Sequence, residues 1–142
     1  MRATMAAVAA GSLIVMGTSL SAAQAVPAAK AHKRQVVKVV TRHPFGKMLA
    51  AKHDNRSLYI LPSGHCRGDC LTIWPPLLLP KGSTAVPAGV KCLGTAKFAH
   101  LRQITYRGHR LYKFEDDSGS SVTGNGLDGF VVAKFSTGKC HK

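Results

Sequence analysis

The sequence predicts a mostly β fold: a single small disulfide-stapled domain of two pseudo-repeated hairpin units. In residues 103–117, Q-I-T-Y-R-G-H-R-L-Y-K-F-E-D-D, apolar and polar residues alternate on both sides of a central Gly-His pair, which is the pattern of a β-hairpin. Residues 48–61 echo this stretch, with a polar turn in the middle and the pair Leu58-Tyr59 in place of Leu111-Tyr112. No segment shows helical periodicity over three turns. The chain therefore looks like two copies of one β unit.

The N-terminus has the features of a secretory signal peptide. Residues 1–25 combine Arg2 in a short basic start, an apolar core over residues 6–16 and the small-residue cleavage site A-Q-A at residues 23–25. The apolar core is shorter than the roughly 20 residues that a membrane helix requires, and no cysteine follows it to carry a lipid. We therefore expect a secreted, extracellular protein whose mature chain has no transmembrane segment.

Two further regions complete the predicted domain organisation. Residues 26–34 are Ala-rich and basic, with nothing to bury, and they predict a disordered lead-in. Residues 35–142 are expected to form the folded domain. Its first strand is predicted at residues 35–41, Q-V-V-K-V-V-T, which are β-branched almost throughout. Residues 48–52 then open the first hairpin, and its turn is expected at residues 53–56, where Asp and Asn favour a reversal of the chain.

The segment between the two hairpins contains the only tryptophan. Residues 71–77, L-T-I-W-P-P-L, follow a polar loop, and because proline cannot donate to a sheet ladder we expect a strand that stops at Trp74. A large ring at this position is expected to cover the core. A loop at residues 80–89 and a short strand at residues 90–93 should follow. The second hairpin is then expected to turn at Gly108-His109.

All four cysteines lie in the predicted mature chain, where export favours disulfides. Four cysteines allow three pairings, and spacing alone does not choose among them. Cys66 and Cys70 enclose a short polar loop that can fold back on itself, which would leave Cys92 to tie down Cys140 and the C-terminus. We therefore favour the pairs Cys66–Cys70 and Cys92–Cys140.

Several motifs agree in order with one family. They are Gly108-x-x-Leu111-Tyr112-x-Phe114-x-x-Asp117, Cys66-x-x-x-Cys70 and Trp74-Pro75-Pro76-Leu77. Together they resemble the secreted bacterial repeats and lipoproteins defined by a Y-x-[FWY]-x-x-D motif, over roughly residues 45–135. The resemblance implies an exported envelope protein with a secreted-repeat β domain and no established activity. The motif residues that it marks are Tyr59, Trp74, Leu111, Tyr112, Phe114 and Asp117. The first copy, Tyr59-x-Leu61-x-x-Gly64, departs from the pattern because it lacks the second aromatic residue and the Asp.

The motif carboxylate has two interpretations. Tyr112 and Phe114 share one face of a strand, and with Asp117 beside them they could form a small ligand site. Alternatively, the two rings pack together in the core, and Asp117 accepts backbone N–H groups in the turn that ends the strand. We favour the second interpretation.

The remaining motifs predict no cofactor, metal or catalytic site. Residues 124–129 fit G-x-G-x-x-G, but no apolar strand precedes them and no helix follows, so we assign them to a polar loop at residues 118–129, before a closing strand at residues 130–135. His65 is next to a cysteine, yet a thiolate metal site there would need cysteines that export keeps oxidised. The sequence has no nucleophile elbow, and Glu115-Asp116-Asp117 are too close along one chain for opposing acid and base roles. We therefore expect no enzyme.

The charge of the chain suggests its partners. The sequence carries 20 Lys and Arg against 6 Asp and Glu, and loss of Arg2 with the signal peptide leaves a mature charge of about +13, which attracts polyanions. The favoured hypothesis is a monomeric, non-catalytic cell-envelope module that associates with anionic surface polymers and has no specific nucleic-acid partner. The alternative is an extracytoplasmic redox or metal-handling protein that uses the Cys66/Cys70 region.

Overall fold

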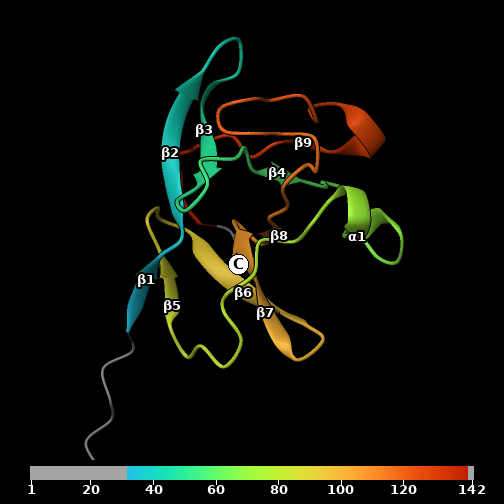
Figure 1. Ribbon diagram of the computed structural model, residues 1–142. Coiled ribbons are helices and arrows are strands. Elements are labelled where there is room, and N and C mark those ends of the chain that lie inside the picture. The colour runs from blue at the N-terminus through green and yellow to red at the C-terminus, as the bar shows by residue number, and fades with distance from the viewer. Residues whose placement is uncertain (1–31, 141–142) are drawn as a thin grey trace, which may run out of the picture.

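The computed structural model describes residues 32–140, and Figure 1 shows how their elements are arranged. The predicted signal peptide, residues 26–31 of the predicted lead-in and residues 141–142 lie outside the described residues. In chain order the elements are β1 (Lys33–Gln35), β2 (Val37–Arg42), β3 (Gly46–Ala51), β4 (Tyr59–Ile60), α1 (Cys70–Ile73), β5 (Val86–Ala88), β6 (Leu93–Phe98), β7 (Leu101–Tyr106), β8 (His109–Arg110), the 3-10 turn η1 (Leu127–Gly129) and β9 (Val131–Val132). The mostly β fold class is therefore confirmed. Within residues 32–140, neither helix has the length and apolar character needed to cross a membrane.

The strands form four small sheets rather than one large sheet. β2 and β3 form an antiparallel hairpin, and β6, β7 and β8 form a three-stranded antiparallel sheet. β1 pairs in parallel with β5, so the chain is already in a strand at Lys33, before the predicted domain boundary. β4 pairs with β9, which places Tyr59 opposite Val132 and joins parts of the chain that are far apart in sequence.

The two predicted hairpins are present with small shifts. In the first, the backbone N–H of Leu58 donates to the carbonyl oxygen of Leu49 at 3.1 Å across the expected turn. The second turns at Arg107 and Gly108, one residue earlier than predicted, with φ angles of 51° and 86°. Positive φ at both central residues is the geometry of a two-residue hairpin loop that matches the twist of its strands. The strand predicted at residues 90–93 contributes only its last residue, to β6.

The strand predicted before Trp74 is wrong. Residues Cys70–Ile73 form a single helical turn, α1, and the N–H of Trp74 donates to the carbonyl oxygen of Cys70 at 2.8 Å. The disulfide between Cys66 and Cys70 closes the preceding residues into a short loop, and Pro75 has no N–H with which to continue the helix. Beyond the prolines the chain is extended, as expected, and Pro76 forms a β-bridge with Tyr112.

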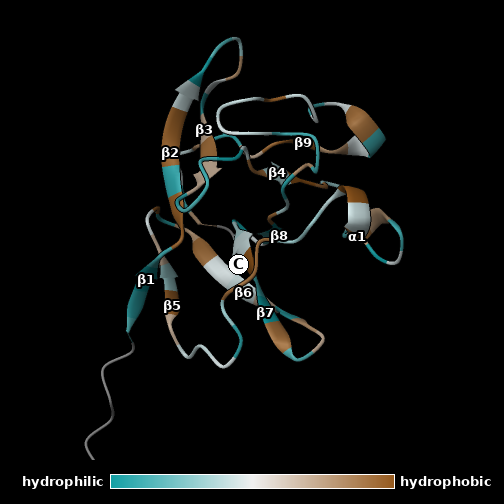
Figure 2. Ribbon diagram, viewed as in Figure 1, coloured by the Kyte–Doolittle hydropathy of each residue, from teal (hydrophilic) through white to brown (hydrophobic). Residues whose placement is uncertain are grey.

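The core consists of two clusters of buried side chains. The aliphatic cluster is Val37, Leu49, Ala51, Leu58, Leu77, Leu79, Ile104, Tyr106, Leu111 and Ala133. The aromatic cluster is Met48, Tyr59, Cys66, Trp74, Tyr112, Phe114, Phe130 and Val132. Neighbours along a strand fall in different clusters because successive side chains point to opposite faces. Figure 2 shows hydrophobic bands separated by a hydrophilic one along β2, whereas β1 is hydrophilic.

The two Leu-Tyr pairs that echo each other in the sequence lie side by side. Tyr59 and Tyr112 exchange backbone hydrogen bonds, with N···O distances of 2.9 and 3.0 Å. Leu58 and Leu111 both enter the aliphatic cluster, and both tyrosine rings enter the aromatic cluster. The repetition of a whole unit is not confirmed, because β4 pairs with β9 whereas β8 pairs with β7.

Candidate functional site

The aromatic motif residues form the centre of the core rather than a surface site. Trp74, Tyr59 and Tyr112 are 0% exposed, and Phe114 is 6% exposed. Trp74 stacks on Phe130 with ring centroids 3.8 Å apart and an interplanar angle of 10°. Phe114 packs against the same indole at 4.8 Å. Such packing removes a large apolar area from water, so these rings stabilise the fold. The remaining motif residue, Leu111, is likewise buried.

Asp117 is buried and fully occupied by hydrogen bonds. Its Oδ2 accepts from the hydroxyl of Tyr59 at 2.6 Å, and its Oδ1 accepts from the N–H and the hydroxyl of Thr123, both at 2.8 Å. Burial, and then the hydrogen bond to Asp117, raise the pKa of Tyr59 well above its ordinary value. The carboxylate therefore accepts a backbone N–H of the loop at residues 118–129, as the second interpretation predicts, and no oxygen of it faces an open ligand site.

The hydroxyl of each of these two tyrosines accepts a hydrogen bond from the loop that follows the other tyrosine. Tyr112, in the second half of the chain, accepts a hydrogen bond at its hydroxyl from the N–H of Cys66, at 3.1 Å, in the loop that follows Tyr59. Tyr59 accepts one at 3.3 Å from the N–H of Gly124, in the loop that follows Tyr112. Each half of the chain therefore supplies the anchor for the loop of the other half.

Both disulfides form with the favoured pairing. Cys66 bonds to Cys70, Cys92 bonds to Cys140, and residues 32–140 contain no free cysteine. Cys66 is 5% exposed. Within the described part of the chain, no three His, Cys, Asp or Glu side chains come together as a metal site would require.

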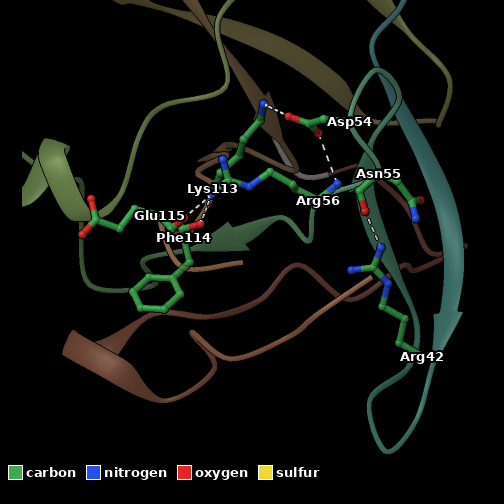
Figure 3. Close-up of polar contacts among 7 residues, drawn as sticks. All are labelled: Arg42, Asp54, Asn55, Arg56, Lys113, Phe114 and Glu115. Carbon is green, nitrogen blue, oxygen red and sulfur yellow. Dashed lines mark hydrogen bonds and ion pairs between the residues drawn. The ribbon is translucent and has the colours of Figure 1, made fainter. Parts of the chain in front are cut away.

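Part of the positive charge is used inside the fold (Figure 3). Lys113 forms an ion pair with Asp54, and Arg56 donates to the carbonyl oxygens of Phe114 and Glu115. Burial raises the pKa of Asp54, but the hydrogen bond from Lys113 and the nearby positive charges outweigh it, so the pKa lies below its ordinary value. These groups tie the turn of the first hairpin to the second hairpin.

Arg42 is the one basic residue that is buried among those described, at 8% exposed. Its guanidinium donates to Ser57 and to three backbone carbonyl oxygens, those of Asn55, Gly119 and Ser121. The charge therefore connects the first hairpin to the loop that Asp117 also holds. Arg42, Arg56 and Lys113 therefore stabilise the fold through these contacts.

A long segment of the chain contains basic but no acidic side chains. No Asp or Glu occurs between Asp69 and Glu115, a segment that includes all of β6, β7 and β8. Within residues 32–140 the only ion pair is the one between Lys113 and Asp54. Among the described residues, no ion pair therefore neutralises the positive charges of the three-stranded sheet. The basic residues of this segment outside the fold's own contacts include Lys91, Lys97, His100 and His109.

A basic pocket of about 220 Å³ lies between this sheet and the Cys66–Cys70 loop. We call it the basic pocket; its charged and titratable lining groups are His65, Arg67, Lys97 and Arg110. Arg110 is fixed by two neutral acceptors, the side-chain oxygen of the buried Gln103 at 2.7 Å and the carbonyl oxygen of Lys97 at 3.0 Å. No carboxylate lines the pocket, so the guanidinium is held in place with its charge unpaired.

The electrostatics of His65 agree with a positive field in the basic pocket. The Nε of Arg67 donates to Nε2 of His65 at 2.7 Å. The positive charge of Arg67, then slight desolvation and then the charge of Arg110 lower the pKa of His65. The imidazole therefore acts as a neutral acceptor that orients Arg67 beside the pocket.

Sequence reasoning missed this pocket. Its lining comes from residues 65–68, 71, 97–99 and 110, and only the tertiary fold brings these segments together. The absence of acidic residues between Asp69 and Glu115 was the available signal. Comparison of the chain with protein-family models, curated proteins and solved structures finds no match.

Proposed function

We propose that this protein is an exported, non-catalytic module that binds anionic polymers of the cell surface, with the basic pocket as the strongest point of attachment. The observation that carries the proposal is the environment of Arg110. Its guanidinium is oriented by neutral acceptors, and neither a lining carboxylate nor an ion pair neutralises it. An arginine fork held in this way suits the oxygen atoms of a phosphate, sulfate or carboxylate group.

The surrounding surface extends the attraction beyond one group. Lys97 lines the pocket and Lys91 precedes β6, both exposed, so repeated charges of a polymer can be neutralised together. Binding of this kind releases counterions and weakens steeply as salt is added. The two disulfides support an extracytoplasmic location, because such bonds persist in oxidising compartments. The proposal treats the protein as a monomer in the cell envelope.

The test compares two variants that lose the same charge. Arg67→Gln with Lys97→Gln removes two exposed charges at the basic pocket, and Lys47→Gln with Lys81→Gln removes two exposed charges elsewhere. Binding of polyphosphate and of polygalacturonate is measured by calorimetry between about 50 and 200 mM salt. We expect the pocket variant to lose roughly tenfold in affinity, equivalent to about 1.4 kcal/mol, and the control variant to lose clearly less. Equal losses would show diffuse binding without a preferred site, and absence of binding by the wild type would overturn the proposal.

A further inference from the structure

A larger cleft lies away from the basic pocket and shares no lining residue with it. Its volume is about 720 Å³, within the range of small-molecule sites. It is bounded by the β2–β3 turn at Phe45, by the β4–β9 sheet and by the β7–β8 turn. We call it the apolar cleft, because aliphatic and aromatic side chains provide most of its lining.

The floor of the apolar cleft is a pair of apolar residues at the edge of the core, of which Ile60 is half-buried and packs against the aliphatic cluster. Ile60 and Val131 are opposite each other in the β4–β9 pairing, so their side chains share one face. Their neighbours Tyr59 and Val132 point to the other face, into the aromatic cluster. Val131 is 37% exposed. The β4–β9 sheet therefore buries one face and presents apolar side chains on the other.

The wall of the cleft includes polar groups of Tyr106 and Asn125 that form hydrogen bonds within the protein. Tyr106 is 3% exposed, and its hydroxyl accepts from the N–H of Ser136 at 3.0 Å and lies 3.3 Å from the carbonyl oxygen of the same residue. The N–H of Val132 donates to the side-chain oxygen of Asn125 at 3.0 Å. These contacts leave the aliphatic floor, with the exposed edge of Tyr106 beside it, as the surface that a ligand would meet.

The rim of the cleft is positive and carries no acidic side chain. Arg107, His109 and Lys134 line it together with the apolar residues, and no Asp or Glu does. Arg107 donates to the carbonyl oxygens of Gly138 at 3.2 Å and Lys139 at 2.5 Å, which are neutral acceptors. Its position is therefore fixed, and within residues 32–140 no carboxylate pairs with its charge. His109 and Lys134 are exposed.

We propose that the apolar cleft binds a single-chain amphiphile with one anionic head group. The chain lies against Ile60, Val131 and the ring of Tyr106, and the head group lies at the rim near Arg107 and Lys134. Burial of the hydrocarbon supplies affinity in proportion to the area removed from water, and the positive rim selects an anion over a cation. This activity is separate from polymer binding, because it uses another surface and another chemistry.

The test uses the mature protein with both disulfides intact and three ligands below their micelle concentrations: decanoate, decyl sulfate and decyltrimethylammonium. Calorimetry measures affinity, and backbone amide NMR shifts report location. We expect both anions to bind at least tenfold more tightly than the cation, with shifts centred on Ile60 and Val131. A preference between the two anions identifies the head group as carboxylate or sulfate. Equal affinity for the cation, or no binding up to the solubility limit, would overturn the proposal.

Matched variants locate the site. Val131→Asp places a charge on the floor, and Val39→Asp is its control, because Val39 is 38% exposed on β2 and does not line the cleft. Lys134→Glu reverses a rim charge, and Lys81→Glu is its control. We expect both cleft variants to weaken decanoate binding about tenfold and both controls to leave it within about twofold. If the controls weaken binding as much as the cleft variants, the proposal is wrong. Retained polyphosphate binding by Val131→Asp separates the two activities.

Discussion

The hydroxyl of Tyr59 donates a hydrogen bond of 2.6 Å to Asp117, although 58 positions separate the two residues in the chain. Both side chains are buried, at 0% and 4% exposed. The bond joins the first hairpin to the loop that follows the second. Asp117 also accepts two hydrogen bonds from Thr123, so one carboxylate organises the loop and fixes it to the core.

Replacement of Asp117 should destabilise the protein more than replacement of its neighbour. Asp117→Ala leaves buried donors of Tyr59 and Thr123 without an acceptor, and we expect a loss of about 1–3 kcal/mol in the free energy of unfolding. Asp116→Ala should cost far less, because Asp116 is exposed. Urea denaturation of both variants measures the difference. Equal, negligible losses would contradict the structural role of Asp117.

Gly124 should not tolerate even a methyl group. A Cβ atom at this position would lie 2.8 Å from the ring of Trp74 and 2.9 Å from Phe114. Gly124→Ala therefore overpacks the aromatic cluster, and we expect a loss of about 1–3 kcal/mol in thermal or urea denaturation. Gly138→Ala is the control, because a Cβ atom there would meet nothing closer than 3.5 Å. A Gly124→Ala variant as stable as Gly138→Ala would contradict this packing.

The two disulfides should differ in how much each contributes to the free energy of unfolding. The Cys92–Cys140 bond closes a sequence separation of 48, and the Cys66–Cys70 bond closes one of 4. Chain entropy then predicts about 4 kcal/mol of stabilisation for the longer loop and about 2 kcal/mol for the shorter. Replacing each pair by serines and measuring urea denaturation tests the order. A larger loss for the short loop would contradict it.

The same bonds separate the two functional hypotheses. We expect thiol titration of the native exported protein to find no free thiol, and peptide mapping to find Cys66 joined to Cys70. A reactive pair of thiols in this region would instead favour the redox or metal-handling alternative. Thiol titration of the denatured protein in the same experiment controls for buried thiols that the reagent does not reach.

Acid should weaken the contact between Asp54 and Lys113. The folded-state pKa of Asp54 lies below its ordinary value of 3.8, so its contribution to stability is complete above that value and is lost as the pH falls through the folded pKa. We expect Asp54→Asn to flatten the stability profile below about pH 4, by well under 1 kcal/mol because the pair is partly exposed. Lys113→Met should flatten the same region. Profiles parallel to the wild type would contradict the pair's contribution.

The sequence predicts the parts of this fold that depend on local patterns. Alternation around the two Leu-Tyr pairs indicates the strands, and the short polar loop between Cys66 and Cys70 favours the disulfide pairing that forms. The helical turn α1 was missed because three or four residues carry no periodic signal, and its geometry depends on the disulfide before it and Pro75 after it. Contacts outside the segment itself, rather than its own residue pattern, therefore determine the structure of α1.

The candidate sites were beyond what the sequence could predict, for a different reason. The guanidinium of Arg110 owes its orientation to Gln103, a polar residue that is 0% exposed and lies on the neighbouring strand. The apolar cleft depends on the pairing of Ile60 with Val131. Both arrangements bring together distant segments, and a single sequence without this register gives no indication of them.

The hydrogen bonds of Tyr59 and Tyr112 to each other's loops make the two halves of the chain depend on each other. Because the hydroxyl of each tyrosine accepts a hydrogen bond from the loop of the other half, neither half contains all the partners of its own loop. If one loop detaches, the tyrosine hydroxyl of the opposite half loses a hydrogen-bond partner. Opening of one loop is therefore coupled to opening of the other. The domain should therefore unfold in one all-or-none transition, and a protease cut in either loop would loosen both.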